Sequence, residues 1–326
     1  MIRWAAIGTG TISRSVIPDL QQYVPDSEVV IVHSRDLKKA QAFAEEFNIP
    51  AATDDFEAII HNDQIDVLYI ATPFAVHHDM AKRALEAGKH VLVEKPMALN
   101  AAEVADLFAT ARAHNVFVME AMWMKFTPMF HELQEQIRGG VIGDVRSVRA
   151  AFGLPLPDET GSRTDLARSG GALLDQGIYP VTLAHVFLGE PRDVHAAGTV
   201  RADGLDFSEH FNFEYEDGKY AQGASSMVEF TEVTASIAGT RGWITLTPPF
   251  WATTDFEVHA GGPLRIFRQP GKVEYEREGN NYGPMLRAVV EAIHNGWLEH
   301  PTHTQQDTLA VFRTMDRIFA QIRAEG

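Results

Sequence analysis

The sequence predicts an α/β protein in which a doubly wound parallel sheet is followed by a second, α+β domain with an open, mostly antiparallel sheet. Short apolar runs alternate with amphipathic helical segments through the first third of the chain, as in a parallel sheet. A glycine-rich turn directly follows the first apolar run. After about Trp123 the pattern changes to helical patches and alternating strands. We therefore expect two domains, residues 1–122 and 123–326.

Strands and helices alternate in the first predicted domain. The strands are expected at Arg3–Ile7, Val29–His33, Val67–Ala71, His90–Val93 and Val116–Met119, and the helices at Ile12–Gln22, Leu37–Phe47, Phe56–His61, Asp79–Ala87 and Ala101–His114. Asp36 and Asn100 are expected to be helix N-caps, and Gly88 is expected to end a helix.

The second predicted domain mixes helices with strands. Helices are expected near Pro128–Arg138, Gly171–Leu188, Met285–His294 and Thr304–Ile322, and alternating strands from Val194 to Phe267. One hairpin is predicted to turn at Asp217-Gly218. The last helix, residues 304–323, is assigned to the second domain, with packing against the first domain as an alternative.

The composition excludes several classes of protein. The formal net charge is −16 without a compensating basic cluster, so neither nucleic acid nor a membrane surface is an expected partner. The chain has no cysteine, which excludes disulfides and thiolate metal sites and fits a reducing compartment. No apolar run suits a signal peptide or a membrane span. We expect a cytoplasmic protein that acts on a small molecule.

A glycine-rich turn joins the first predicted strand to the first predicted helix. Its sequence, Gly8-Thr9-Gly10-Thr11-Ile12-Ser13, has the context of a dinucleotide-binding Rossmann fingerprint. Gly8 permits the tight turn, Gly10 lets the backbone approach a pyrophosphate, and the helix N-terminus offers free N–H groups. Gly8, Thr9, Gly10, Thr11 and Ile12 are therefore candidate cofactor contacts. The alternative is an ordinary glycine turn.

The end of the second predicted strand bears on the choice of cofactor. An acidic residue there would bind the ribose 2′-hydroxyl of NAD, but this chain has His33-Ser34-Arg35. Arg35 can pair with a 2′-phosphate, Ser34 can donate to it, and Lys39 lies one helical turn beyond Arg35. The sequence favours NADP, with NAD as an alternative. Otherwise Arg35 and Lys39 belong to a solvated helix surface.

Candidate catalytic residues occur in two places. The apolar run Val91-Leu92-Val93 ends in Glu94-Lys95-Pro96, at the sheet edge where α/β proteins bind ligands. Asp175 and Tyr179 stand at positions i and i+4 of a predicted helix, so they share a face. Hydride transfer from an alcohol needs a base, and a nearby ammonium such as Lys95 would lower the pKa of a tyrosine. We predict Tyr179 as acid/base, Lys95 as its partner and Asp175 as a substrate ligand. The alternative is that Tyr179 packs in the core and Asp175 caps the helix.

These residues also carry a family resemblance. The matching motifs are Gly8-x-Gly10, Ala71-Thr72-Pro73 with His77, Ala87–Val91 leading into Glu94-Lys95-Pro96, and Gly171–Tyr179. With them the chain resembles the glucose–fructose oxidoreductase, inositol dehydrogenase and MocA (Gfo/Idh/MocA) family. Glu120–Phe126, together with Tyr179, is most similar to the branch of dimeric dihydrodiol dehydrogenases and NADP-dependent xylose dehydrogenases.

The resemblance implies a Rossmann domain followed by a substrate-binding domain whose open sheet is often used for dimerisation. It implies the same roles for Lys95 and Tyr179, and a cis bond before Pro96. Cofactor contacts are implied at Thr72, Pro73, His77, Glu94, Lys95 and Pro96. The chain departs from its relatives at Phe74, where many carry asparagine, and at Lys125, where the dihydrodiol branch usually has arginine. Its tyrosine at 179 replaces the histidine that is common in inositol dehydrogenases.

Several aromatic residues are candidates for lining the substrate pocket. Aromatic side chains at Trp123, Phe152, Phe250 and Trp251 are candidate walls for a sugar or an apolar ring, or else ordinary core residues. The segment 155–168 is either a loop that covers the cleft or a surface excursion.

No metal site is expected at His77-His78, because adjacent imidazoles do not share a helical face. His294, His300 and His303 are expected at the surface.

Taken together, the residues and the resemblance predict an NADP-preferring oxidoreductase acting on CH–OH groups. The predicted reaction is oxidation of an aldose at its anomeric carbon or of a trans-dihydrodiol. One alternative is a reductase of a dicarbonyl or keto sugar, because hydride transfer is reversible. Another is a dinucleotide-binding sensor without turnover. A homodimer or homotetramer is expected.

Overall fold

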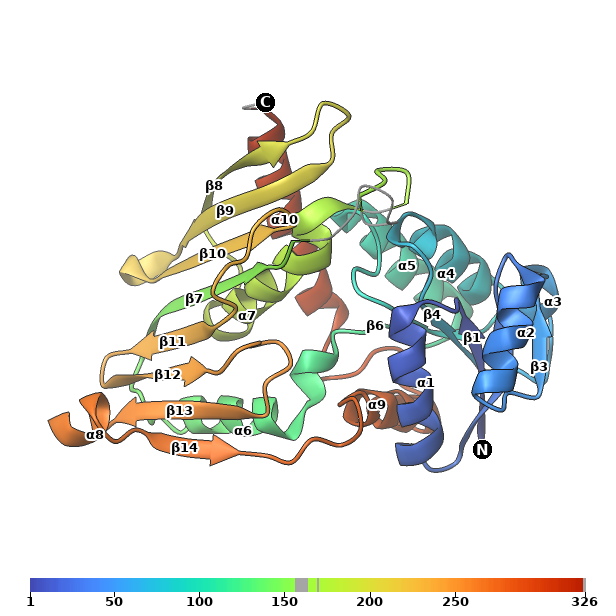
Figure 1. Cartoon of the computed structure of the whole chain (residues 1–326), viewed down its shortest axis with the longest axis horizontal. Helices are drawn as coiled ribbons and strands as arrows, with labels where there is room; N and C mark the ends of the chain where they lie inside the picture. Colours follow the sequence, from blue (N-terminus) through green and yellow to red (C-terminus); the bar gives the residue numbers. More distant parts are fainter. Residues whose placement is uncertain (156–163, 169, 325–326) are drawn as a thin grey trace. The chain divides into compact units, whose positions relative to one another are not determined.

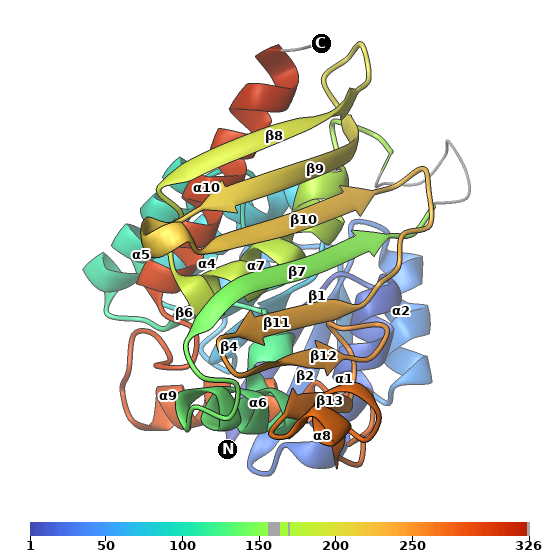
Figure 2. The same cartoon turned by 90° about the vertical axis from the view of Figure 1, so that its left-hand side faces the viewer.

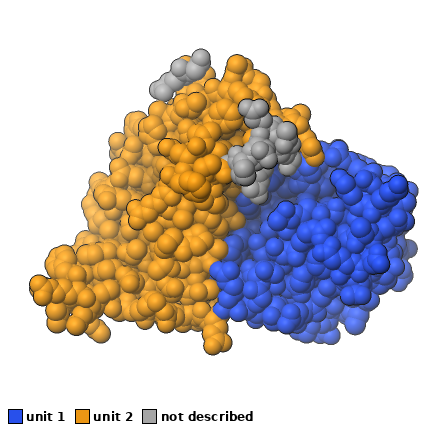
Figure 3. Space-filling model, in the orientation of Figure 1, with its two compact units in different colours: residues 1–127, 277–308 blue, residues 128–276, 309–326 orange. Residues whose placement is uncertain are grey.

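The computed structural model describes residues 1–155, 164–168 and 170–324. The chain forms two compact units (Figure 3): residues 1–127 with 277–308, and residues 128–276 with 309–326. Among the described residues, no helix is long and apolar enough to cross a membrane.

The first unit, which contains the N-terminus (Figure 1), is built on a six-stranded sheet. The strand order is β3-β2-β1-β4-β5-β6, and every neighbouring pair is parallel. The strands are β1 (Ile2–Ile7), β2 (Ser27–His33), β3 (Ala51–Thr53), β4 (Val67–Ile70), β5 (His90–Val93) and β6 (Val118–Glu120). From β1 the chain adds β2 and β3 on one side of the sheet and then β4, β5 and β6 on the other. Because the crossover connections between parallel strands are right-handed, this change of direction places helices on both faces of the sheet. The predicted doubly wound sheet is confirmed. The short edge strand β3 escaped prediction because its three residues carry no recognisable apolar pattern.

Six α-helices belong to this unit: α1 (Thr11–Tyr23), α2 (Leu37–Glu46), α3 (Phe56–Ile60), α4 (His77–Glu86), α5 (Ala101–His114) and α9 (Gly283–His294). Two 3₁₀ turns, η1 (Phe74–Val76) and η2 (Trp123–Phe126), follow β4 and β6. The predicted N-caps are confirmed: the Asp36 side chain accepts from the N–H groups of Lys38 and Lys39, and Asn100 accepts from that of Glu103. Gly88 follows α4 with a φ of 79°, as a helix terminator should.

The segment 277–308 joins the first unit, although the sequence assigned all of 123–326 to the second domain. The reason is a set of long-range contacts. The buried carboxylate of Asp19, on α1, accepts from the backbone N–H groups of Asn280 and Tyr282, at 2.9 Å in each case. The Tyr282 ring packs on Trp123 at 5.1 Å between centroids.

The second unit contains an eight-stranded sheet in the order β14-β13-β12-β11-β7-β10-β9-β8. Its strands are β7 (Val145–Gly153), β8 (Asp193–Val200), β9 (Asp206–Glu214), β10 (Tyr220–Ser226), β11 (Ala235–Gly239), β12 (Gly242–Leu246), β13 (Asp255–Ala260) and β14 (Gly271–Glu274). All neighbours are antiparallel except β7 and β10. The mostly antiparallel sheet is therefore confirmed, as is the hairpin, which turns at η4 (Glu216–Gly218) between β9 and β10.

The described residues of this unit also form α6 (Pro128–Arg138), the π-helix η3 (Leu173–Gly177), α7 (Ile178–Leu188), α8 (Pro263–Phe267) and α10 (Gln305–Ala324). The first residues of α10 belong to the first unit. Figure 2 looks onto the face of the sheet opposite α7 and α10. The strand prediction that ran to Phe267 is wrong at its end, because Pro263 begins a helix there. It also missed the central strand β7, where a buried Val148 precedes an exposed Arg149.

Candidate active site

The glycine turn after β1 has the geometry that a dinucleotide requires. Gly8 has a φ of 114°, and a Cβ atom there would overlap the carbonyl oxygen of Ala71, at the end of β4. A Cβ at Gly10 would meet nothing within 4 Å. Gly10 precedes α1, whose first turn has neither a side-chain cap nor an acidic residue. The N-terminal N–H groups of α1 are thus available to an anion such as a pyrophosphate.

Ser34, Arg35 and Lys39 lie at the carboxyl end of β2 and in the first turn of α2. Ser34 is half-buried, and its N–H donates to the carbonyl of Thr53 at 3.2 Å. Arg35 and Lys39 are exposed. Both cations are therefore accessible at the strand end where we expect the ribose of the cofactor.

His77 links the turns that follow β4 and β5. It is fully buried, with its Nδ1 at 2.8 Å from the carbonyl oxygen of Pro96 and its Nε2 at 2.8 Å from that of Thr72. Burial lowers its pKa, and a neutral imidazole can donate to only one of these oxygens at a time. The structure thus places His77 between two loops of the sheet edge, where the protein itself engages both ring nitrogens. The hydroxyl of Thr72 is buried and finds no hydrogen-bond partner among the described residues.

Glu94 and Lys95 follow β5 directly, and the Lys95–Pro96 bond is cis, as the resemblance implied. Glu94 is buried and accepts a hydrogen bond from the Tyr69 hydroxyl at 2.7 Å. Burial raises the pKa of this carboxyl to about 7, although Tyr69 and the charge of Lys95 oppose the shift. The Lys95 ammonium lies 5.8 Å from the centre of the Phe74 ring.

Asp175 and Tyr179 lie in the second unit and are both buried. Asp175 belongs to the π-helix η3, and Tyr179 to the first turn of α7. The predicted helix is therefore present but begins with i→i+5 hydrogen bonding. Such π-segments are frequent at functional sites.

Three aromatic side chains gather around this helix start. Phe152 and Trp251 stack with their ring centres 3.4 Å apart, and the Tyr179 ring lies 5.8 Å from Phe152 and 6.0 Å from Trp251. Phe250 is fully buried and meets Trp251 edge-on. Of the predicted wall residues, three thus cluster with Tyr179, whereas Trp123 belongs to the first unit. Residues 156–163 of the predicted covering loop lie outside the described residues.

Two buried carboxyl groups of β9, Asp206 and Glu209, lie beside the start of η3, and no sequence pattern had indicated them. The carboxylate of Asp206, on β9, accepts from the N–H of Leu173 at 2.7 Å. A Cβ at Gly171, whose φ is 85°, would overlap this carboxylate, so glycine is required there. Glu209, on the same strand, lies near enough to Asp206 for the two carboxyl groups to interact electrostatically, and it accepts from the Ser225 hydroxyl. Burial raises the pKa of Asp206 to about 6, and burial with the neighbouring Asp206 raises that of Glu209 well above its ordinary value.

Replacing Glu209 by glutamine is expected to make the free energy of unfolding less dependent on pH. A carboxyl whose folded pKa is raised stabilises the fold at low pH, and this contribution is lost as the pH rises through the folded pKa. The wild type should therefore lose stability as the pH rises from the ordinary glutamate pKa of 4.5 through the raised pKa of Glu209, whereas an amide has no proton to lose. Urea unfolding should find the variant more stable than the wild type at neutral pH, with a smaller difference at pH 5. The exposed Glu232→Gln variant is the control, and a difference that does not change with pH would contradict the expectation.

The expectation that His294, His300 and His303 lie at the surface is correct only for His294. His300 is buried against the Phe126 ring at 5.4 Å. His303 is buried beside Glu120, with its Nε2 at 3.1 Å from the carboxylate. Glu120 lies far away in the sequence, so no local pattern indicated this burial. His78, next to His77, has its Nε2 at 2.8 Å from a carboxylate oxygen of Asp106.

Family models match both halves of the chain. Residues 2–122 match the oxidoreductase family with an NAD-binding Rossmann fold, and residues 130–245 match the GFO/IDH/MocA C-terminal domain. The trans-1,2-dihydrobenzene-1,2-diol dehydrogenase of Xenopus tropicalis is 34% identical over 325 residues, which are 98% of each chain. The chain belongs to the Gfo/Idh/MocA oxidoreductase family. The human dehydrogenase of the same name is 35% identical over 92% of this chain and 90% of its own.

Solved structures extend the Gfo/Idh/MocA comparison. A variant of a 3-ketoreductase from Actinomadura kijaniata, in complex with TDP-benzene and NADP, is 26% identical with a TM-score of 0.87 and covers 98% of both chains. An aldose-aldose oxidoreductase from Caulobacter crescentus, complexed with glycerol, shares the fold with a TM-score of 0.87 at 24% identity. It covers 100% of this chain and 98% of its own.

The structure also shows where two of the residues lie at which this Gfo/Idh/MocA protein departs from its relatives. Phe74 lies on the 3₁₀ turn after β4, beside the Lys95 ammonium. Lys125 is buried on η2 and binds Asp307 at 3.0 Å. Lys125 thus keeps the positive charge of the arginine that the dihydrodiol branch usually has at this position, and its side chain is buried.

Proposed function

We propose that this chain is an NADP-preferring dehydrogenase that exchanges hydride with a sugar or a vicinal diol. The observation that carries the proposal is the arrangement around Tyr179. A buried tyrosine faces a stacked pair of aromatic rings, and a buried carboxylate lies four residues before it. Aromatic faces suit an apolar ring or the C–H face of a sugar, and a carboxylate suits a neighbouring hydroxyl. The dihydrodiol dehydrogenases, 34–35% identical over most of the chain, support a diol substrate.

In the proposed reaction Tyr179 takes the proton of the substrate hydroxyl as the C–H hydride departs. Lys95 favours the phenolate form of Tyr179 by its positive charge. Asp175 accepts a hydrogen bond from an adjacent substrate hydroxyl and so orients the reacting carbon. A bound nicotinamide supplies the hydride acceptor in oxidation and the donor in reduction.

The cofactor is proposed to lie along the carboxyl edge of the first unit's sheet. The turn at Gly8–Ile12 and the uncapped start of α1 suit its pyrophosphate. The proposed contacts near the nicotinamide lie after the ends of β4 and β5: Thr72, Pro73, Glu94, Lys95 and Pro96. His77 is buried behind these turns and contacts the carbonyl oxygens of Thr72 and Pro96. The NADP in the ketoreductase complex supports the choice of cofactor.

Replacing Arg35 by alanine is expected to raise KM for NADP by about tenfold or more and to leave KM for NAD within about twofold. The reason is that a guanidinium pairs with a 2′-phosphate, which NAD lacks. Initial rates with both cofactors measure the effect, and Lys38→Ala, which removes an exposed cation from the first turn of α2, is the control. An equal loss with both cofactors would remove Arg35 from this role.

Reduction of a keto sugar is the second candidate, because a 3-ketoreductase is among the structural relatives at 26% identity. Absorbance at 340 nm tests both directions, with NADP and a panel of aldoses, polyols and trans-dihydrodiols, and with NADPH and dicarbonyls or keto sugars. Turnover identifies the substrate class and the favoured direction. Cofactor binding without turnover throughout the panel would contradict the proposal and favour a sensor.

The protein is further proposed to be a cytoplasmic homodimer or homotetramer that associates through the second unit. Helices α7 and α10 lie on one face of its sheet, and Figure 2 shows the strands of the other face. An extended sheet face of this kind suits a symmetric partner. Sedimentation of a single species of 36.1 kDa would contradict it.

A further inference from the structure

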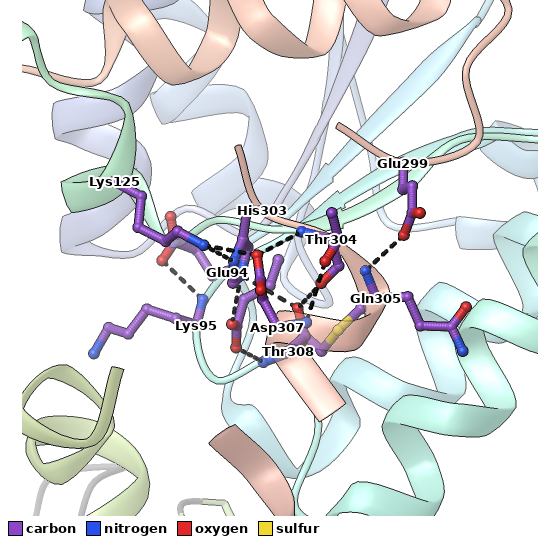
Figure 4. Close-up of polar contacts among 11 residues, drawn as sticks. Glu94, Lys95, Lys125, Glu299, His303, Thr304, Gln305, Asp307 and Thr308 are labelled. Atoms are coloured by element: carbon purple, nitrogen blue, oxygen red, sulfur yellow. Dashed lines mark hydrogen bonds and ion pairs between the residues drawn. The ribbon is translucent and has the colours of Figure 1, made fainter. Parts of the chain in front are cut away.

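A group of ionisable side chains lies behind the turn that carries Lys95. It consists of Glu120 at the end of β6, Lys125 on η2, His303 before α10 and Asp307 in the first turn of α10, and is called the Glu120 cluster below. Glu120, Lys125 and His303 are 1%, 5% and 2% exposed. Figure 4 shows Lys125, His303 and Asp307 converging, while the Lys95 side chain extends away from them.

The hydrogen bonds of the cluster admit one consistent direction. The Lys125 ammonium has only donors, so at 3.2 Å it donates to Nδ1 of His303. His303 is then neutral and carries its proton on Nε2, which donates to Glu120 at 3.1 Å. Burial, reinforced by the charge of Lys125, lowers the pKa of His303, in agreement with the neutral form.

The cluster is anchored at its outer end by the start of α10. The Lys125 ammonium also donates to Asp307 at 3.0 Å. Asp307 and Thr304 form a reciprocal cap, in which each backbone N–H donates to the other's side chain at 3.2 Å. Asp307 is therefore held in place independently of Lys125 and fixes the position of that cation.

At its inner end the cluster meets the turn of Lys95. The second oxygen of Glu120 accepts from the backbone N–H of Met97 at 3.0 Å. Met97 immediately follows Pro96, whose carbonyl oxygen contacts His77. The N–H of Lys95 donates to Glu94 at 3.2 Å. The backbones of three consecutive turn residues thus each contact a different buried side chain.

Glu120 can hold Met97 only while its other oxygen is satisfied. A buried carboxylate that loses one partner keeps its desolvation cost, so it tends to move toward another donor or to take up a proton. Either change would release the N–H of Met97 and loosen the turn. His303 supplies the missing partner, and Lys125 fixes the tautomer that makes His303 a donor to Glu120.

We infer that His303 and Lys125 are positioning residues for the reaction: acting through Glu120 and Met97, they hold the turn that places the Lys95 ammonium. Neither residue needs to touch substrate or cofactor to do this. The inference rests on the proposed role of Lys95. It also gives a reason for a cation at position 125, since the tautomer of His303 depends on a donor there.

The test is a double-mutant cycle between positions 303 and 95. His303→Leu is expected to lower kcat by about 10- to 100-fold, the effect of misplacing a catalytic group, with the Kd for NADP changed by less than about threefold. In the Lys95→Met background the same substitution should lower kcat by less than about twofold, because the group it positions is absent. His303→Gln, which keeps a donor and an acceptor, should restore kcat to within about threefold of wild type. Val104→Ala, in the core of α5, is the control for a general loss of stability.

The possible results separate the two hypotheses. An equal loss of kcat from His303→Leu in both backgrounds would overturn the positioning role while leaving the role of Lys95 intact. Full activity of Lys95→Met alone would contradict the proposed function and the inference with it. Should His303→Leu fail to fold, Lys125→Met enters the same cycle, because it removes the donor to Nδ1 and leaves the imidazole in place.

Discussion

Replacing Tyr179 by phenylalanine is expected to lower kcat by about 10²–10⁴-fold. The substitution removes only the hydroxyl, so the ring should keep its place beside Phe152 and Trp251. Without the hydroxyl, no acid/base at this position can take the proton of the substrate. The affinity for NADP should stay within about threefold, because the proposed cofactor contacts belong to the other unit.

Steady-state rates at 340 nm and titration of NADP binding by fluorescence measure the two quantities separately. Tyr215→Phe is the matched control, since Tyr215 is also a buried tyrosine of the second unit and lies outside the proposed site. Its kcat should equal that of the wild type. A Tyr179→Phe variant that retained a third or more of wild-type kcat would remove Tyr179 from the acid/base role.

Replacing Lys95 by methionine is expected to lower kcat at neutral pH by about 10²-fold or more, within the range for general acid–base catalysis. Methionine keeps much of the apolar stem and removes the charge. An ammonium near a phenol lowers the pKa of the phenol, so its removal raises that pKa. In the direction of alcohol oxidation, the rising limb of the pH profile should therefore move to higher pH, and part of the activity should return under alkaline conditions.

Rates of oxidation between pH 6 and pH 10 test this expectation. Lys82→Met is the control, because Lys82 forms a partly exposed ion pair with Asp106 on the helices of the same unit. A low rate with an unchanged pH profile would mean that Lys95 orients the substrate or the cofactor without tuning the acid/base. An unchanged rate would exclude Lys95 from the reaction.

Local physical chemistry made much of the first unit predictable. Buried parallel strands are continuous apolar runs, and the helices between them begin at side chains such as Asp36 and Asn100 that bind free N–H groups. The turn at Gly8 was predictable because only glycine combines a positive φ with a close backbone approach. The sheet edge that carries Lys95 followed from the rule that α/β sheets bind ligands beyond their carboxyl ends.

The sequence by itself determined most strands of the parallel sheet, the glycine turn, and which residue types stand at the ends of β1, β2 and β5, because these depend on neighbours within a few residues. Only the tertiary structure decided how residues far apart in the chain pair. His303 reaches Glu120 across 183 positions, and Asn280 reaches Asp19 across 261. The pairing of Asp206 and Glu209 beneath η3 likewise depends on how β9 packs against a helix that precedes it in the chain. Partners of this kind are selected by the cost of burying an unpaired polar group, which arises only once the chain has folded.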